Sequence, residues 1–395
     1  MRMSQTFCTF ARFLHIHGYK YTLPHKIYLF MRVLIAMSGG IDSAVAAMLL
    51  LEQGHDLVGI TFRTFDSINE SCLSREKGCC SVESIMEAKH LAQTLGFPHH
   101  IVDFRETFRR HVIANFVDEY AHGRTPNPCV LCNSHIKWGE LLKAADEYQC
   151  DCIATGHYAR IAEHRGHQYL RNAVDTRKDQ TYFLWMLTED NLRRTLFPLG
   201  GLTKTEVRQI ALQKGFERLS RKTESQEICF VPNNDYRTFL AGQGVQVAAG
   251  NYVDATGKVL GQHEGFCHYT IGQRKGLGIA LGKPRFVTRI DAERNEVCLG
   301  NHDELYTTTV HATAARLRDA DWLHNAPEVE ARIRYKSPAI PARIDLSDFT
   351  PDHPRLTLHF TQPVWGVTPG QSLVIYKDGL LVGGGLISPQ KTEKR

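Results

Sequence analysis

The feature that most limits the fold of this chain is the segment Ser38–Ser43, Ser-Gly-Gly-Ile-Asp-Ser, between a strand-like run at Val33–Met37 and a helical pattern over Ser43–Gly54. Two adjacent glycines permit backbone angles that other residues avoid, so successive N–H groups can point at one oxyanion. The two serine hydroxyls and the helix N-terminus add donors. The segment therefore predicts a phosphate loop for a nucleotide, with a serine-capped strand-to-helix turn as the alternative.

Two details refine this prediction. The segment has neither the Gly-Lys-[Ser/Thr] of a Walker loop nor the three-glycine spacing of a dinucleotide fingerprint. Asp42 would be repelled by a phosphate unless a divalent cation lay between them, so the motif implies Mg²⁺ together with the nucleotide.

Strand and helix patterns alternate after the loop. A strand at Leu57–Phe62, a helix at Ser81–Gly96 and a strand at His100–Phe104 predict a parallel α/β sheet, whose ligands bind at the carboxyl ends of the strands. Amphipathic helices at 108–122 and 135–148 and a buried strand at 152–155 continue this part. After about residue 230 the segments become glycine-rich and strand-like, and the last hundred residues are predicted to be all-β.

Composition narrows the class of protein. Hydrophobic residues make up 43% and charged residues 23%, which excludes a disordered or collagenous chain. The longest apolar stretch, Ala44–Leu51, is far shorter than the ~20 residues of a membrane span, so no membrane association is expected. Residues 1–30 hold four basic and no acidic side chains and account for most of the net charge of +5. Since Met31 opens directly into a strand, we expect 1–30 to be an over-long gene start or a disordered tail, with an organelle transit peptide as the alternative.

The eleven cysteines are expected to be mostly reduced thiols, because their number is odd and no convincing secretory signal precedes them. Cys129 and Cys132 differ from the rest because two prolines and an asparagine stiffen the segment that holds them. Cys132 is predicted to lie just ahead of a helix, whose dipole would favour the thiolate. Cys229 is a second isolated thiol. Four others are expected to be small buried hydrophobes: Cys150, Cys152, Cys267 and Cys298.

These motifs resemble known families. Ser-Gly-Gly-x-Asp-Ser resembles the PP-loop of the N-type ATP pyrophosphatases over residues 31 to about 200. Together, T-P-N-P-x-x-x-C-N, S-x-x-I-C-F and H-Y-T-I-G-Q-R-K-G-L-G resemble the tRNA-specific 2-thiouridylase (MnmA) family from Met31 to the C-terminus. The resemblance implies a Rossmann-like parallel-sheet PP-loop domain (31–228), a small mainly β central domain that contacts tRNA (229–305) and a C-terminal β-barrel that binds tRNA (306–395).

The resemblance also implies a reaction: ATP-dependent 2-thiolation of the wobble uridine 34 in tRNAs for Lys, Glu and Gln. The C2 oxygen would be adenylated and replaced by sulfur from a cysteine persulfide, with release of AMP and pyrophosphate. By motif, Cys229 would carry the persulfide and Cys132 would be the partner nucleophile. The residues implied for ATP are Ala36, Met37, Ser38, Gly39, Gly40, Ile41, Asp42, Ser43, Phe62 and Gly156. Those implied for tRNA or the target base are Asn127, Pro128, Cys129, His157, Lys178, Asp179, Gln180, Arg334, Tyr335 and Gln371.

Simpler alternatives remain for some of these residues. Lys178–Gln180 could be a solvated turn. Arg334 and Tyr335 could be ordinary polar residues at an exposed strand end, although a guanidinium beside an aromatic ring suits an extruded base.

Cys129 departs from the family pattern, which usually has aspartate at this position. Three explanations are open: the carboxylate is dispensable, a Cys129 thiolate takes over proton removal, or Cys129, Cys132 and Cys229 together hold an iron-sulfur cluster or zinc. Cys72, Cys79 and Cys80 are expected to be loop thiols without a role, with a mobile thiol pair as the alternative for the last two.

The remaining expectations concern partners. The sulfur would come from a cysteine desulfurase, directly or by relay, and we expect a cytoplasmic monomer. Two other functions stay open. An amide- or amidine-forming ligase would need no paired thiols, and a tRNA- or metal-binding protein with an inactive loop would not turn ATP over to AMP.

Overall fold

The computed structural model describes residues 30–65, 82–221 and 228–389. The described residues from Met31 onward form one compact unit. The predictions for residues 1–29 and for Cys72, Cys79 and Cys80 lie outside the described residues. Within those described ranges, no helix has the length and apolar character needed to cross a membrane.

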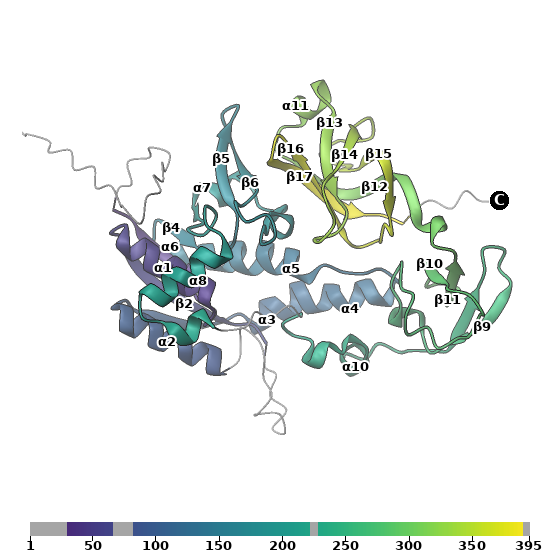
Figure 1. The fold of residues 1–395 in the computed structure, drawn as a ribbon, viewed down its shortest axis with the longest axis horizontal. Helices are drawn as coiled ribbons and strands as arrows, with labels where there is room; N and C mark the ends of the chain where they lie inside the picture. Colours follow the sequence, from purple (N-terminus) through teal and green to yellow (C-terminus); the bar gives the residue numbers. More distant parts are fainter. Residues whose placement is uncertain (1–29, 66–81, 222–227, 390–395) are drawn as a thin grey trace, which may run out of the picture. The chain divides into compact units, whose positions relative to one another are not determined.

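The first sheet is parallel, as predicted. Its strand order is β3-β2-β1-β4-β7, and the strands are β1 (Arg32–Ala36), β2 (Asp56–Arg63), β3 (His99–Asp103), β4 (Cys152–Ala154) and β7 (Thr195–Leu196). Helices cover both faces of β1 (Figure 1), because Val33 and Ile35 pack with one cluster of helical residues and Leu34 with another. The helices are α1 (Ile41–Glu52), α2 (Val82–Leu95), α6 (Leu141–Glu147), α7 (Glu189–Arg193), α8 (Lys204–Gln213) and α9 (Glu217–Ser220).

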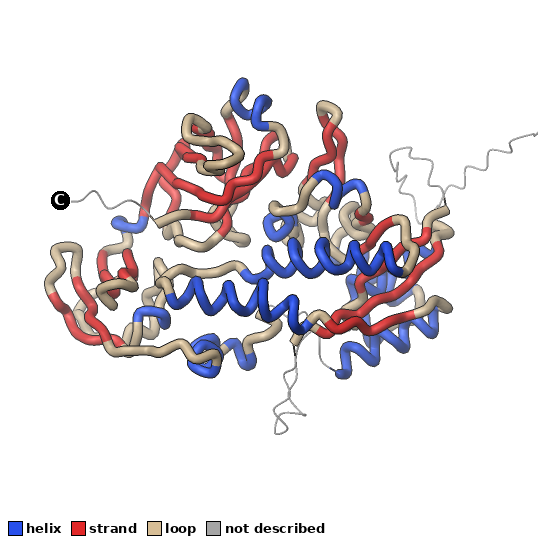
Figure 2. Tube along the Cα trace, turned by 180° about the vertical axis from the view of Figure 1, so that it is seen from behind, coloured by secondary structure: helices blue, strands red, loops and turns tan. Residues whose placement is uncertain are grey.

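Two long helical rods follow the third strand and run side by side (Figure 2). Each rod contains a π-helical stretch. The first consists of α3 (Arg105–Phe108), η1 (Arg109–Ile113) and α4 (Ala114–Ala121), and the second of α5 (Pro128–Leu131), η2 (Cys132–Glu140) and α6. The second rod begins at Pro128 rather than at the predicted His135, because a proline suits the first helical position. Cys132 therefore lies inside a helix and not ahead of one, which corrects the prediction of an N-terminal thiolate.

A small mainly β domain follows, as predicted. It begins with α10 (Tyr236–Gly242) and contains a sheet of order β10-β11-β8-β9. The strands are β8 (Gly250–Val253), β9 (Val259–His263), β10 (Phe286–Asp291) and β11 (Glu296–Gly300).

Short 3₁₀ turns occur in the first domain at η3 (Thr181–Leu184) and further along the chain at η4 (Pro232–Asn234), η5 (Phe266–His268) and η6 (Asp303–Leu305).

The C-terminal part is a closed β-barrel, which confirms the predicted architecture. Six strands follow one another in the order β12-β15-β14-β13-β16-β17, and pairing of β12 with β17 closes the ring. They are β12 (Tyr306–Leu317), β13 (Glu328–Arg332), β14 (Ile340–Asp345), β15 (Leu356–Trp365), β16 (Ser372–Lys377) and β17 (Leu380–Ile387), with α11 (Ala320–Asn325) after β12.

The barrel also pairs with a hairpin from the first domain, which the sequence did not reveal. The hairpin comprises β5 (Arg160–His164) and β6 (His167–Arg171), and β6 pairs with β17 through Leu380 and Leu381 (Figure 1). The first domain and the barrel therefore share one sheet although more than 200 residues separate these strands.

Candidate functional site

The Ser38–Ser43 segment joins β1 to α1 and is braced from within. Ser43 Oγ donates to the Gly40 carbonyl (3.0 Å) and accepts from the Ser38 backbone N–H (3.2 Å). Gly39 has a φ of +66°, and a Cβ there would lie 2.3 Å from the Ser84 carbonyl oxygen, so only glycine fits. Because Gly40 provides no side-chain cap for α1, the first-turn N–H groups are suited to an anion.

Gly156 closes one side of this loop. A Cβ at Gly156 would come within 2.8 Å of the Asp42 carbonyl carbon and of the Ser43 nitrogen. The segment after β4 therefore lies directly against the start of α1, so only a residue without a side chain fits at Gly156. Phe62, near the end of β2, is half-buried and packs its ring against Phe104 at a centroid distance of 5.3 Å.

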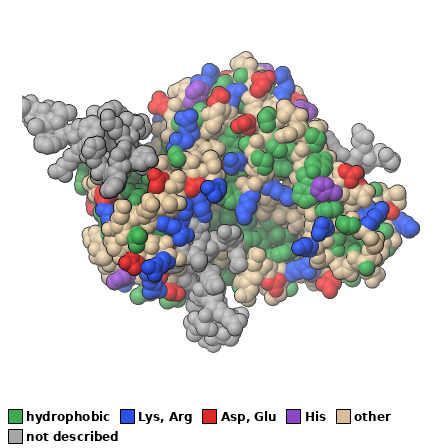
Figure 3. Space-filling model, viewed as in Figure 1, with side chains coloured by type: hydrophobic (Ala, Val, Ile, Leu, Met, Phe, Trp, Pro, Cys, Tyr) green, Lys and Arg blue, Asp and Glu red, His purple; other side chains and the backbone are tan. Residues whose placement is uncertain are grey.

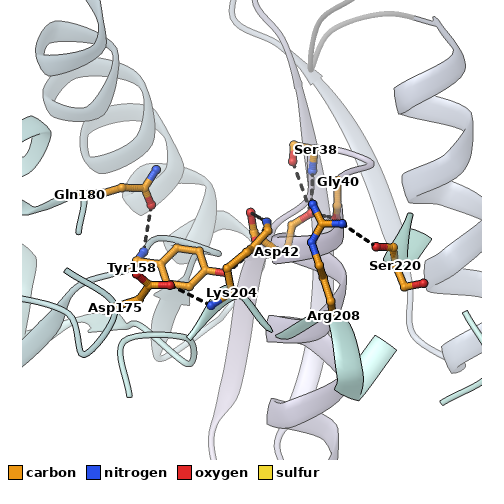
Figure 4. A network of polar contacts seen from close by, with 10 residues as sticks. Ser38, Gly40, Asp42, Tyr158, Asp175, Gln180, Lys204, Arg208 and Ser220 are labelled. Atoms are coloured by element: carbon orange, nitrogen blue, oxygen red, sulfur yellow. Dashed lines mark hydrogen bonds and ion pairs between the residues drawn. The ribbon is translucent and has the colours of Figure 1, made fainter. Parts of the chain in front are cut away.

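Asp42 has a partner that sequence reasoning missed (Figure 4). Lys204 Nζ lies 2.8 Å from both carboxylate oxygens of Asp42, and the Tyr158 hydroxyl donates to Oδ1 at 2.8 Å. The Lys204 side chain is only 10% exposed, and its backbone N–H donates to Asp175 Oδ2 at 3.0 Å. The motif implied a divalent cation as the only compensation for the charge of Asp42, but in the structure an ammonium group already compensates this charge.

The sequence around Lys204 contains a signal for the start of a helix. Thr203 and Glu206 form a capping box, in which each side chain bonds to the backbone N–H of the other. This pattern fixes the first residue of α8, Lys204, at a helix start, but only the tertiary fold brings that helix to the phosphate loop.

The two proposed sulfur-handling cysteines border one hydrophobic cluster. Cys132 is half-buried and packs against it, as do Ile228 and Phe230, which flank the exposed Cys229. Phe62 packs against the same cluster from the end of β2. The segments that carry both thiols are thus brought together beside the nucleotide sheet although about a hundred residues separate them.

Cys129, Cys132 and Cys229 are all described, yet no group of three His, Cys, Asp or Glu side chains within residues 30–65, 82–221 and 228–389 is placed to hold a metal ion. The arrangement does not support the iron-sulfur or zinc explanation for Cys129.

Cys129 lies near Lys137, which forms a basic pair with His157. The Cys129 residue reaches solvent, yet the protein atoms packed around its sulfur raise the pKa of the thiol, and the nearby Lys137 ammonium offsets only part of this. A thiol of raised pKa stays protonated near neutral pH, which argues against a Cys129 thiolate as the proton acceptor.

His157 is the second member of this basic pair, with Lys137 Nζ 3.3 Å from its Nε2. Burial, and secondarily the Lys137 charge, hold the pKa of His157 well below its usual range, so the imidazole is neutral. With Nε2 accepting from Lys137, Nδ1 carries the proton and donates to Thr155 Oγ1, 2.8 Å away.

The segment Lys178–Gln180 is not a solvated turn. Asp179 is 2% exposed, and its carboxylate accepts from the Ala173 backbone N–H, the Thr181 hydroxyl and Arg332. Gln180 Oε1 accepts from the Tyr158 backbone N–H at 2.9 Å, and Lys178 is half-buried. These residues tie the neighbourhood of the phosphate loop to the barrel.

Arg334 is not at a freely exposed strand end either. Its Nη2 donates to Thr368 Oγ1 (2.7 Å), to the Gly366 carbonyl and, at 3.4 Å, to the Ile271 carbonyl. The guanidinium lies over the Trp365 ring, and Tyr335 packs on Phe183 with ring centroids 4.3 Å apart. Arg334 thus has internal partners at the junction of the barrel and the central domain, and Tyr335 has one at the junction of the barrel and the first domain.

Asn127 and Pro128 lie at the start of the helix that carries Cys129 and Cys132. Pro128 is buried, and the Asn127 side chain lies near the buried Tyr182, whose hydroxyl donates to the Ser372 carbonyl. Gln371 bonds to the same loop through its side-chain amide.

Three family models match the chain in sequence. They are a tRNA methyl transferase HUP domain over residues 31–233, a tRNA methyl transferase PRC-barrel domain over 237–301 and an aminomethyltransferase β-barrel domain over 303–387. Among solved structures, a 4-thiouridine synthetase in complex with RNA and bound ATP aligns with a TM-score of 0.35 and 21% identity, over 54% of this chain and 50% of that chain. That likeness is too weak to support a conclusion.

Full-length relatives are much closer. The tRNA-specific 2-thiouridylase MnmA of Amoebophilus asiaticus is 46% identical over 372 residues, covering 90% of this chain and 95% of the relative. The proteins of the same name from Cytophaga hutchinsonii and Carboxydothermus hydrogenoformans are each 45% identical, covering 90% of this chain and 97% of theirs. At this identity, and over nearly the whole length of each relative, the chain belongs to the tRNA-specific 2-thiouridylase MnmA family.

Proposed function

We propose that this protein is a tRNA-uridine 2-sulfurtransferase that uses ATP to convert wobble uridine 34 of tRNAs for Lys, Glu and Gln to 2-thiouridine. We also propose that its three domains span residues 31–228, 229–305 and 306–395. One observation carries the proposal. The phosphate loop follows β1, and Phe62 on the paired strand β2 packs in the same cluster as Cys132 and the neighbours of Cys229. The loop proposed to activate ATP and the segments of the two proposed sulfur-handling thiols thus lie at the same end of the sheet, which supports the proposal.

The first step would activate the C2 oxygen of the uridine. That oxygen attacks the α-phosphorus of ATP, pyrophosphate leaves, and AMP becomes the leaving group on C2. The N–H groups of the Ser38–Ser43 loop and the start of α1 would hold the departing phosphates, and the Lys204 ammonium would add positive charge at the loop.

A magnesium ion fits this loop as a nucleotide-bound cation. Mg²⁺ takes one or two carboxylates together with phosphate oxygens and water, and Asp42 supplies one carboxylate that is 32% exposed. Bound there, the ion would neutralise phosphate charge. The residues of this chain would hold it through Asp42, with Lys204 and Tyr158 orienting that carboxylate.

The second step would deliver sulfur. The terminal sulfur of a Cys229 persulfide attacks C2 and expels AMP, and the Cys132 thiolate then attacks the Cys229 sulfur. Alternatively, Cys132 attacks the persulfide first and the released hydrosulfide attacks C2. On either route the persulfide S–S bond breaks, its electron pair stays with the delivered sulfur, and a Cys132–Cys229 disulfide forms that an external thiol reductant must reopen.

The surface around the site suits RNA. Figure 3 shows Lys and Arg side chains gathered along a hollow in which hydrophobic side chains are visible, a combination that fits phosphates and unstacked bases. Within the proposal, Asn127, Pro128, Cys129 and His157 face the target base, and Lys178, Asp179, Gln180, Arg334, Tyr335 and Gln371 border the tRNA site. The protein would act as a cytoplasmic monomer, supplied with persulfide sulfur by a cysteine desulfurase, directly or by relay.

The test is 2-thiouridine formation in tRNA lacking the modification, with ATP and a persulfide donor, measured by nucleoside mass spectrometry on anaerobically purified protein. We expect Cys132→Ser and Cys229→Ser each to lose thiolation, while the matched variant Cys298→Ser, at a buried cysteine of β11, retains it. AMP should form in proportion to 2-thiouridine. AMP formation without 2-thiouridine that persists in the Cys132→Ser, Cys229→Ser double variant would instead favour an amide-forming ligase. An absence of AMP would favour a binding protein with an inactive loop.

A further inference from the structure

The turn that leads into β16 of the barrel lies against the loop that precedes the helix carrying Cys129 and Cys132, which we call the cysteine helix. The loop is Arg124–Pro128 and the turn is Thr368–Ser372, so about 240 residues separate them along the chain. A Cβ at Gly370 would lie 2.9 Å from the Thr125 carbonyl oxygen and 2.7 Å from Glu119 Oε2. A residue without a side chain is therefore needed where the two segments touch.

Gln371 makes the central contact. Its Nε2 donates to the Thr125 carbonyl (3.1 Å) and to the Pro126 carbonyl (2.9 Å), so one amide group satisfies two successive loop oxygens. The Thr125 backbone N–H donates in return to the Pro369 carbonyl at 2.9 Å. These three hydrogen bonds fix the backbone immediately before Asn127 and Pro128.

The turn is itself held rigidly on the barrel. The Gly370 N–H donates to the Ile387 carbonyl, and the Ile387 N–H donates to the Gln371 carbonyl at 2.8 Å. On the loop side, Arg124 Nε and Nη2 each donate to the Glu119 carboxylate at 2.8 Å, which anchors the loop to α4. The loop is therefore clamped between a helix of the nucleotide domain and the barrel.

A second connection runs through Tyr182. Its hydroxyl donates to the Ser372 carbonyl at 2.9 Å. Burial raises the pKa of this hydroxyl, and the neighbouring Asn127 side chain offsets part of that rise. The helix that begins at the next residue, Pro128, carries Cys129 and Cys132. Any shift of the turn would therefore move the start of the cysteine helix.

We propose that Gln371 is a positioning residue for sulfur transfer: the barrel sets the place of Cys132 through the Gln371 amide, and this role does not require Gln371 to touch tRNA. The inference rests on the proposed reaction and goes beyond it, because it gives the barrel a role in placing the Cys132 nucleophile. It concerns the placement of a nucleophile, where small displacements have large effects on rate.

The experiment compares Gln371→Met, which keeps length but loses both donors, with Gln371→Lys, whose ammonium can donate to the same two carbonyls. Gln362→Ala, at an exposed glutamine of β15, is the matched control. The first readout is amide hydrogen exchange in peptides covering 124–131, on protein without tRNA or ATP. We expect exchange there to accelerate about tenfold in Gln371→Met, to stay slow in Gln371→Lys and the control, and to be unchanged in peptides from β1.

The second readout is the rate of thiolation at saturating tRNA together with the tRNA Kd. Gln371→Met should lower the rate about tenfold and leave the Kd unchanged, with recovery in Gln371→Lys. A raised Kd with unchanged exchange at 124–131 would overturn the proposal in favour of direct tRNA contact. Faster exchange that includes β1 would overturn it in favour of a general loss of stability, and unchanged exchange and rate would leave Gln371 no role. Because the exchange arm needs no activity, it tests the clamp even if the proposed reaction is wrong.

Discussion

The phosphate loop and the cysteine loop are built in opposite ways. Ser38–Ser43 is braced by contacts among its own residues, and its one strained position, Gly39, is visible in the sequence as a glycine. Arg124–Pro128 is held by residues about 245 positions away, such as Gln371. An anion cradle needs only backbone N–H groups in one short stretch, whereas a nucleophile that works with a distant second thiol must be placed by the whole fold.

The comparison has one exception, which the first prediction tests. Asp42 belongs to the local loop, yet its charge partner Lys204 lies on α8, 162 residues away. We expect Lys204→Met to lower tRNA-dependent pyrophosphate release about 100-fold, because removal of a buried ammonium leaves Asp42 uncompensated beside the incoming phosphates. The measurement is initial-rate pyrophosphate release at saturating tRNA.

Lys214→Met is the matched control, since Lys214 lies at the end of the same helix and its ion pair with Glu52 is on the surface. We expect it to behave as the unmodified protein. Normal pyrophosphate release by Lys204→Met would show that the loop works by local contacts alone.

The second prediction tests whether the backbone conformation at Gly39 is needed for the Ser38–Ser43 loop. Gly39→Ala should lower the free energy of unfolding by about 2 kcal/mol or more, because a positive φ is strained for alanine and the new methyl would meet the Ser84 backbone. Gly40→Ala, one residue on, has an extended φ of −94° and would meet only Ser38 Oγ at 3.4 Å. The check is the thermal unfolding midpoint of both variants; equal midpoints would refute the conformational argument.

The third prediction, the smallest in effect, concerns Cys129, which lies in the helix directly after the Arg124–Pro128 loop. The raised pKa of Cys129 means that alkylation by iodoacetamide should require a pH above the ordinary thiol range, because burial disfavours the thiolate. Lys137→Met should move the midpoint further upward, by less than about one pH unit, since the Lys137 ammonium favours the thiolate. Peptide mass spectrometry across pH measures this directly. A Cys129 midpoint below the ordinary range would restore its thiolate as a candidate base.

Much of the fold followed from periodicity. The parallel sheet, the mainly β middle and the barrel were predicted because strand alternation, helix spacing and glycine-rich turns are written into contiguous residues. The helix start at Pro128 was missed, because the segment with two prolines was interpreted as a stiff connection between two helices. The pairing of β6 with β17 was also missed, because strand partners far apart in sequence leave no mark in the pattern of either strand.

The sequence by itself determined the phosphate loop, the two cysteine motifs and the family, since each depends on the order of neighbouring residues. Only the tertiary structure decided which charge meets Asp42, which protein group neighbours Cys129, and which residue holds the cysteine loop. Side chains such as Lys204, Lys137 and Gln371 are ordinary surface types in a sequence. They become specific because the fold removes water from around them and brings one donor or one charge within hydrogen-bond distance.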